Sequence, residues 1–168
     1  EKFIDVLSSV AESMIVNNYA DHIYTLSKGV SWITFQNECV AVRIDDQLCK
    51  QGKGITLYSA FKQNLKGDKI YTVFEDSEGD EWILTNKGIS IVGKKQVDSD
   101  FPFQYIKEAD GIIYLVSQSD KLASYNFKSR QFKFIEIPYH VSMINEVKKF
   151  DSNTLLLATD NGLIIYKI

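Results

Sequence analysis

The sequence is poor in proline, cysteine and histidine, with two of each among its 168 residues. Two cysteines cannot build a disulfide scaffold, and without a CxxC pair or a neighbouring histidine cluster they predict no zinc site. Cys39 and Cys49 fit either two separate thiols or one disulfide between a strand and the following turn. We therefore expect no metal or other cofactor.

The sequence also lacks long apolar runs and a dominant charge. No run approaches the ~20 apolar residues of a membrane span, and no charged-then-apolar leader follows Glu1. The 19 basic and 22 acidic residues leave a net charge of −3, which argues against a nucleic-acid partner held by a basic face. The contents of 45% hydrophobic and 24% charged residues exclude a disordered chain.

Short apolar runs fill most of the sequence, and turn-type residues separate them. Such runs, rich in β-branched and aromatic residues, predict an all-β protein. The clearest are Ile70–Phe74, Trp82–Leu84, Ile89–Val92, Ile112–Val116, Phe132–Ile137, Leu155–Leu157 and Leu163–Tyr166. Outer-strand candidates are Ile55–Ala60, Phe132–Ile137 and a weak segment near Gln96–Asp98. Residues 3–16 fit a helix or a strand equally well.

The runs belong to an internal repeat. Asp21–Thr25 returns as Asp68–Thr72, and Gly29–Ile33 returns as Gly79–Ile83. A large residue recurs at a mean spacing of about 41 residues, which is typical of propeller blades of four short strands. The anchors are Trp32, Trp82, Tyr114 and Leu156. We expect about four four-stranded β-propeller blades over 19–168, a leftover element of a preceding blade over 1–18, and a fragment of a larger ring.

The repeat assigns structural roles to residues that could otherwise be read as functional. Trp32 and Trp82 occupy equivalent positions, so we expect them to pack between blades rather than to stack on sugar rings. Asp76, Glu78, Asp80 and Glu81 lack the ordered oxygen spacing of a calcium loop and predict a solvated turn. We expect His22 to be an exposed, structural residue.

One block of the sequence resembles the two-component regulator propeller repeat. Tyr71–Val92 contains a strand ending in Glu75-Asp76, a turn with Gly79, then Trp82–Thr85 and a glycine turn into a further strand. Leu155–Tyr166 resembles the second half of the same repeat. The chain departs from the family at Leu84, where glycine is usual, and at Leu156, where tryptophan is usual.

The resemblance implies a role in signalling. Such repeats form the extracytoplasmic sensor region of Bacteroides-type hybrid two-component systems, which sense oligosaccharides released from glycans. It implies a periplasmic domain that is joined to the membrane only through other parts of its protein. It also implies a sensor that is not an enzyme, and we expect no catalytic residue.

The resemblance and the expected topology together suggest a ligand-binding face. In a propeller, the loops between blades and the turns between second and third strands share one end. Side chains there with paired donors and acceptors suit sugar hydroxyls. The expected ligand-binding residues are Asn86, Lys87, Asp120, Tyr139, His140 and Asn161.

Two other functions remain open from the sequence. The first is a protein-interaction propeller, because open blade edges favour self-association, for example as a homodimer. The second is an enzyme similar to the streptogramin lyases, for which only His140 could serve as the catalytic histidine.

Overall fold

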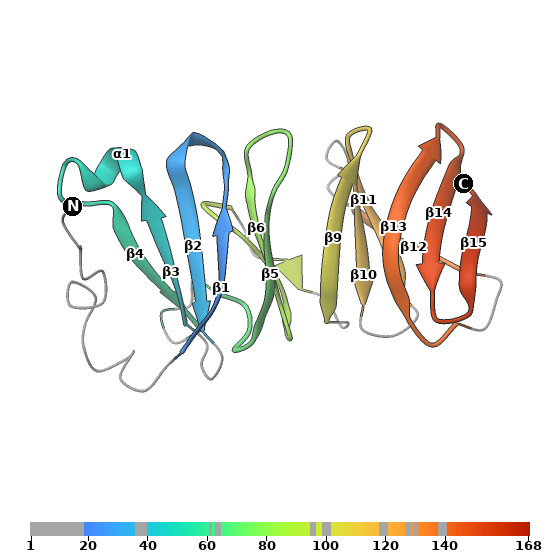
Figure 1. Ribbon diagram of the computed structural model, residues 1–168, viewed down its shortest axis with the longest axis horizontal. Coiled ribbons are helices and arrows are strands. Elements are labelled where there is room, and N and C mark those ends of the chain that lie inside the picture. The colour runs from blue at the N-terminus through green and yellow to red at the C-terminus, as the bar shows by residue number, and fades with distance from the viewer. Residues whose placement is uncertain are drawn as a thin grey trace.

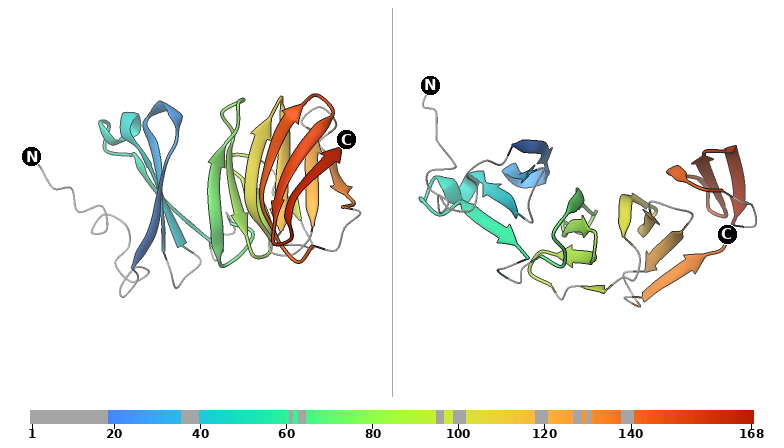
Figure 2. Two further views of the ribbon diagram at one scale, coloured as in Figure 1. Left: turned by 45° about the vertical axis from the view of Figure 1, so that its right-hand side comes forward. Right: turned by 90° about the horizontal axis from the view of Figure 1, so that it is seen from below.

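Four antiparallel sheets stand side by side in an arc and form propeller blades (Figures 1 and 2). The computed structural model describes residues 19–35, 40–60, 62, 65–94, 97–98, 102–117, 121–126, 129, 131–137 and 141–168. The predicted all-β class and propeller architecture are therefore confirmed. The expected element over 1–18, and the choice of helix or strand for 3–16, fall outside the described residues.

Each blade is a meander in which consecutive strands pair. Blade 1 contains β1 (Ala20–Thr25), β2 (Val30–Phe35), β3 (Val40–Asp45) and β4 (Ile55–Ser59), with a 3-10 turn η2 (Ser27–Gly29) and a short helix α1 (Asp46–Cys49). Blade 2 contains β5 (Ile70–Glu75), β6 (Glu81–Thr85), β7 (Gly88–Ile91) and β8 (Val97–Asp98). Blade 3 contains β9 (Phe103–Ala109), β10 (Ile112–Ser117), β11 (Leu122–Asn126) and β12 (Gln131–Ile135).

Blade 4 contains three strands within the described residues: β13 (Ile144–Asp151), β14 (Thr154–Thr159) and β15 (Gly162–Lys167). The expectation of four strands is thus met in blades 1 to 3, and the three outer-strand candidates form β4, β8 and β12. The first strands of the blades, β1, β5, β9 and β13, line the concave side of the arc (Figure 2). None of the helices in the described part of the chain is long and apolar enough to cross a membrane.

A repeated hydrogen-bond pattern closes the hairpins of blades 2 and 4. The hydroxyl of Thr85 donates to the Gly88 carbonyl at 2.8 Å, and that of Thr159 donates to the Gly162 carbonyl at 2.8 Å. Both glycines have positive φ, 139° and 106°, which side chains disfavour. In both blades a threonine and a glycine three positions later therefore fix the turn. We call the pairs Thr85–Gly88 and Thr159–Gly162 the turn lock.

The anchor residues pack between neighbouring blades, as the sequence predicts. Trp32 is fully buried in a cluster with Val73 and Ile83 of blade 2. Trp82 is 1% exposed and packs in a cluster with residues of blade 3, its ring 5.2 Å from that of Tyr125. Tyr114 joins the cluster between blades 3 and 4. Leu156, on the last blade, is half-buried.

The acidic turn of blade 2 differs from the prediction. Asp76 is only 5% exposed, and its carboxylate accepts hydrogen bonds from the Trp82 indole N–H at 2.7 Å and the Asp80 backbone N–H at 2.8 Å. Glu81 is also shielded and binds residues of blade 1. The expectation of a solvated turn was wrong for Asp76 and Glu81, whose carboxylates accept from donors that burial would otherwise leave unpaired, whereas Glu78 is exposed.

Candidate functional site

Three of the predicted ligand-binding residues lie in turns at one end of the blades. Asn86 and Lys87 lie between β6 and β7, and Asn161 lies between β14 and β15. Figure 1 shows both turns at the lower end of the molecule. We call the end that carries these two turns the loop face. Asp120, Tyr139 and His140 lie outside the described residues.

Asn86 and Lys87 hold the connection that leads into blade 2. The Asn86 side-chain oxygen accepts from the backbone N–H groups of Asp68 at 3.0 Å and Lys69 at 3.2 Å. The Lys87 ammonium pairs with the Asp68 carboxylate at 3.0 Å. The hydrogen bonds that the Asp68 carboxylate accepts, first from Lys87 and then from the Asn86 amide N–H at 2.5 Å, lower the pKa of Asp68. The two side chains thus fasten the fold, a role the sequence analysis did not foresee.

Blade 4 repeats this pattern, in which a turn side chain accepts from two backbone N–H groups of the preceding connection, at the residue before Asn161. The Asp160 carboxylate accepts from the backbone N–H groups of Ser142 and Met143, both at 3.2 Å. Asp160 and Asn86 each follow a threonine of the turn lock. This shared position is the sequence signal from which their role in holding the connections could have been predicted. Asn161 comes next, is exposed on the loop face, and donates its backbone N–H to Thr159 at 3.2 Å.

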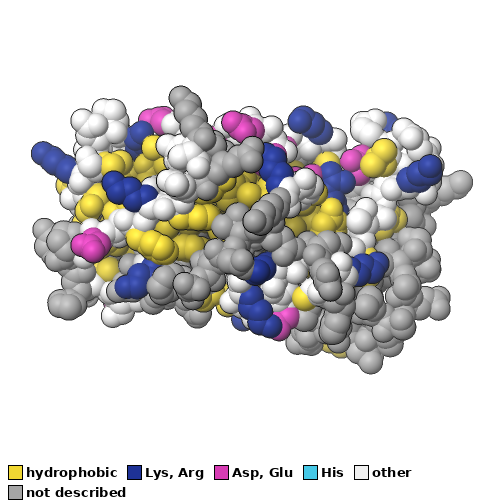
Figure 3. Space-filling model, turned by 180° about the vertical axis from the view of Figure 1, so that it is seen from behind, with side chains coloured by type: hydrophobic (Ala, Val, Ile, Leu, Met, Phe, Trp, Pro, Cys, Tyr) yellow, Lys and Arg dark blue, Asp and Glu magenta, His cyan; other side chains and the backbone are white. Residues whose placement is uncertain are grey.

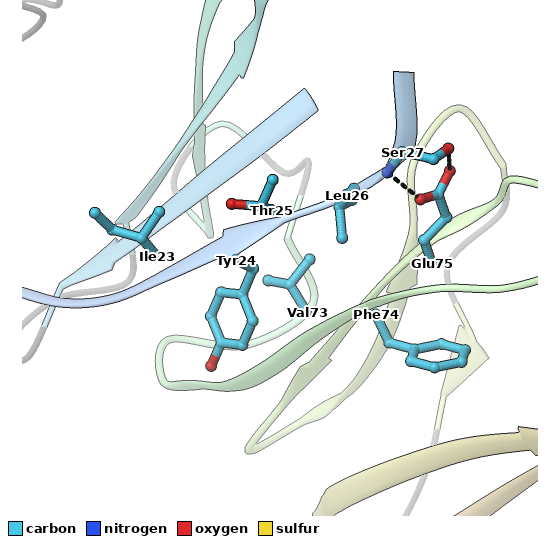
Figure 4. A pocket seen from close by; sticks show the side chains of 8 residues that line it. All are labelled: Ile23, Tyr24, Thr25, Leu26, Ser27, Val73, Phe74 and Glu75. Carbon is cyan, nitrogen blue, oxygen red and sulfur yellow. Dashed lines mark hydrogen bonds between the residues drawn. The ribbon is translucent and has the colours of Figure 1, made fainter. Parts of the chain in front are cut away.

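A groove that the sequence did not predict runs between blades 1 and 2, between β1 and β5 and toward the opposite end of the molecule. It consists of two adjoining pockets of about 510 and 420 Å³ that share Leu26, Ser27 and Glu75. Figure 4 shows the first pocket, whose lining residues come from β1, from Leu26 and Ser27 that follow it, and from β5. We call the two pockets together the interblade groove. Its other residues are Ile23, Tyr24, Thr25, Lys28, Val30, Arg43, Asp45, Gln47, Leu48, Val73, Phe74, Gly79 and Glu81.

A serine–glutamate contact crosses the groove where the two pockets meet (Figure 4). The backbone N–H and the hydroxyl of Ser27 donate to the Glu75 carboxylate at 2.6 and 2.5 Å. The equivalent contact joins blades 2 and 3, where Ser77 binds Glu108 at the same two distances. At the next junction an ion pair between Asp110 of blade 3 and Lys149 of blade 4 replaces it.

A charged network forms the floor of the second pocket. The Glu81 carboxylate accepts from the Trp32 indole N–H at 2.7 Å and binds the Arg43 guanidinium at 2.7 and 2.9 Å. The side chains of Arg43 and Glu81 are only 16% and 12% exposed. Hydrogen bonding to Glu81 raises the pKa of Arg43. One carboxylate of blade 2 therefore ties together two side chains of blade 1.

The Ser27–Glu75 contact predicts a pH effect on stability. Its hydrogen bonds, first that of the Ser27 hydroxyl, lower the pKa of Glu75. A depressed folded-state pKa stabilises the fold above the ordinary glutamate pKa, and this contribution is lost as the pH falls below about 4.3. We expect Glu75→Gln to lose less stability between neutral and acidic pH than the parent chain, as measured by urea unfolding. An identical pH dependence would contradict the assignment.

Comparisons with known proteins identify the fold. No family model and no curated protein matches the chain. Among solved structures, the extracellular domain of BT4673 from B. thetaiotaomicron, described as a hybrid two-component system, matches with a TM-score of 0.65 and 18% identity over 89% of this chain and 22% of its own. The corresponding domain of BT3049 gives 0.61 and 20% identity over 89% of this chain and 20% of its own.

A second group of similar structures consists of enzymes. Virginiamycin B lyase from Staphylococcus aureus matches with a TM-score of 0.61 and 18% identity, over 93% of this chain and 57% of its own. At these identities the similarity establishes the propeller fold alone. The chain spans about a fifth of the two-component extracellular domains that it resembles.

Proposed function

We propose that this chain provides blades of the extracytoplasmic sensor propeller of a two-component signalling protein, and that its ligand is an oligosaccharide derived from a glycan. The similarity to the extracellular domains of BT4673 and BT3049 over 89% of the chain carries the proposal. The repeat pattern supports it independently, because Tyr71–Val92 resembles the repeats of such sensors. Periplasmic localisation is part of the same proposal.

On this proposal the loop face contributes to ligand binding. Asn161 is exposed there, and an amide side chain is a chemical type that can both donate to and accept from sugar hydroxyls. Asp120, Tyr139 and His140 belong to the same proposed face by their positions between successive strands. Asn86 and Lys87 support it by fixing the turn and the adjoining connection.

A thermal-shift panel of oligosaccharides on the intact protein tests the proposed function. A ligand at a hundredfold excess over its Kd stabilises the folded state by about 2.7 kcal/mol. We expect one glycan class to raise Tm in a concentration-dependent manner. We also expect Asn161→Ala to weaken this shift, and Lys133→Ala, an exposed position on β12, to leave it unchanged. No shift across the panel would refute oligosaccharide sensing.

The interaction-propeller alternative is favoured by the exposed sheet face of blade 4. Leu155 and Leu157 pack toward blade 3, so the alternating Leu156 and its strand partner Ile165 face away. Ile165 is 65% exposed and Leu163 is 66% exposed. Figure 3 shows further hydrophobic side chains gathered on the outer side over the half that carries blades 3 and 4. The equivalent residues Trp82 and Tyr114 pack against a following blade, so we propose that a second copy covers this face when the 168-residue chain is expressed alone.

This alternative predicts a change of oligomeric state. Replacing Leu163 and Ile165 together by aspartate places two charges on the face, which desolvation and repulsion would oppose in a dimer. We expect sedimentation velocity to show dimers of the parent chain and monomers of the double variant. Ile23→Asp, at a 69% exposed site on β1 of blade 1, is the matched control and should stay dimeric. A monomeric parent chain would refute self-association through this face.

The lyase alternative is tested with the parent chain and the His140→Ala variant. Its support is the similarity to virginiamycin B lyase, one structure of which is the H270A variant with quinupristin. His22 is exposed and lies 3.0 Å from its neighbour Asp21, which fits a structural residue on β1. We incubate the chain with quinupristin and follow the compound by chromatography, and we expect it to stay unchanged. Conversion that is lost in His140→Ala would establish the enzyme instead.

A further inference from the structure

The interblade groove combines two kinds of surface that a sugar chain needs. Its first pocket, along β1 and β5, is lined by the half-buried Tyr24 and by Leu26 and Val73, which pack in one cluster between the two blades. Its second pocket is lined mainly by polar and charged side chains, including Arg43 and Gln47. Pyranose rings carry C–H bonds on their faces and hydroxyls at their rims, so they can contact both.

We propose that the interblade groove binds a neutral oligosaccharide, at the end of the blades opposite to the loop face. This inference rests on the proposed sensor function and deepens it by naming the ligand class and a second binding surface. Nothing in the repeat pattern marks the groove, because its walls come from strands and turns of two different blades.

The size of the groove favours an oligosaccharide over a single sugar. Each pocket, at about 510 and 420 Å³, falls within the range of ~300–1,000 Å³ for small-molecule sites. The pockets adjoin at Leu26, Ser27 and Glu75, so a linked chain could pass from one to the other across the serine–glutamate contact. A monosaccharide would occupy only one of the two.

The charges of the groove favour a neutral ligand over an anionic one. The second pocket holds the cations Lys28 and Arg43 and the carboxylates Asp45, Glu75 and Glu81. Both oxygens of Glu81 already bind the Arg43 guanidinium, at 2.7 and 2.9 Å. The charge of Lys28 contributes to the lowered pKa of Glu75, which places it near that carboxylate. Since carboxylates outnumber cations, a uronate or sulfated sugar would meet net repulsion.

The main test is calorimetric titration of the intact protein with short malto-, manno- and xylo-oligosaccharides and, in parallel, with oligogalacturonate. The groove variant is the double substitution Gln47→Ala and Leu48→Ala, because both side chains line the second pocket, are exposed, and can be lost without disturbing the core. The matched control is Lys133→Ala, an exposed position on β12 of blade 3 that lies outside both pockets. Asn161→Ala reports on the loop face.

We expect one neutral oligosaccharide to bind and the groove variant to weaken it at least about tenfold, which corresponds to ~1.4 kcal/mol. The control should keep the parent affinity, and added salt should change it little because no ion pair forms. Unchanged affinity in the groove variant together with a loss in Asn161→Ala would overturn the groove and leave the proposed function standing. Tighter, salt-sensitive binding of oligogalacturonate would overturn the neutral ligand class. Absence of binding by every oligosaccharide would overturn both proposals.

Discussion

Replacing Trp82 by alanine is expected to lower the free energy of unfolding by about 3 to 5 kcal/mol. The indole is 1% exposed, packs edge-on against Tyr125 of blade 3 at 5.2 Å, and donates its N–H to the buried Asp76. Truncation would open a cavity between blades 2 and 3 and leave the Asp76 oxygen without its indole donor. Both effects act in the same direction, so the loss should be near the upper end of the range.

Urea unfolding of the 168-residue chain, followed by circular dichroism, measures this effect. Phe150→Ala is the matched control, because Phe150 is also a large aromatic residue but is 70% exposed. The control should change stability by no more than about 0.5 kcal/mol. A loss below about 1 kcal/mol in Trp82→Ala would show that the anchor does not hold the blades together.

Replacing Glu81 by alanine is expected to cost about 2 to 4 kcal/mol, which is the range for breaking a buried ion pair reduced for partial exposure. The loss arises because the Arg43 guanidinium and the Trp32 indole N–H would both lose the acceptor that now binds them at 2.7 Å. The side chains of Arg43 and Glu81 are only 16% and 12% exposed, so water would replace this acceptor poorly.

A double-mutant cycle with Arg43→Met separates this network from simple side-chain loss. In the Arg43→Met background, Glu81→Ala should cost clearly less than in the parent chain, because the guanidinium that would keep only Asp45, at 3.4 Å, is then gone. The stability of Glu81→Gln should lie between those of the parent chain and of Glu81→Ala, since the amide oxygen can still accept from Trp32. Additive effects of the two substitutions would contradict a shared network.

The strands and the blade anchors could be predicted from the sequence because their signals are local. Alternation of apolar residues and glycine turns lie within single blades, and Trp32, Trp82 and Tyr114 recur at the same place in successive blades. The fold class and the inter-blade packing of the tryptophans followed from them and are confirmed.

The polar contacts between blades could not be predicted, because they join residues far apart in the chain. The Trp32–Glu81 hydrogen bond spans 49 positions and the Ser27–Glu75 contact spans 48. The neighbouring acidic residues in the sequence suggested that Glu81 belongs to an acidic turn, and a turn of four carboxylates is expected to be solvated. Only the spacing of the folded blades shows that Arg43 and Trp32 meet it there.

The positions of three proposed loop-face residues could be predicted from the sequence, while their ligand-binding role stays a prediction. Chain topology correctly brought Asn86, Lys87 and Asn161 to one end, because antiparallel meanders repeat the direction of their turns. Asn86 and Lys87 bind the connection at Asp68. These contacts join residues 18 and 19 positions apart, so no local sequence pattern predicts them. The interblade groove escaped prediction for the same reason.

Hydrogen–deuterium exchange of the intact protein with and without a saturating neutral oligosaccharide tests the central claim most directly. The account predicts slower exchange in the β1–η2 segment around Ser27, in the β5–β6 turn around Gly79 and near Asn161 on the loop face. Segments on the far side of the blades, such as β12, should be unchanged. Exchange that is the same with and without every oligosaccharide, at concentrations well above millimolar, would contradict the claim that these blades sense a glycan.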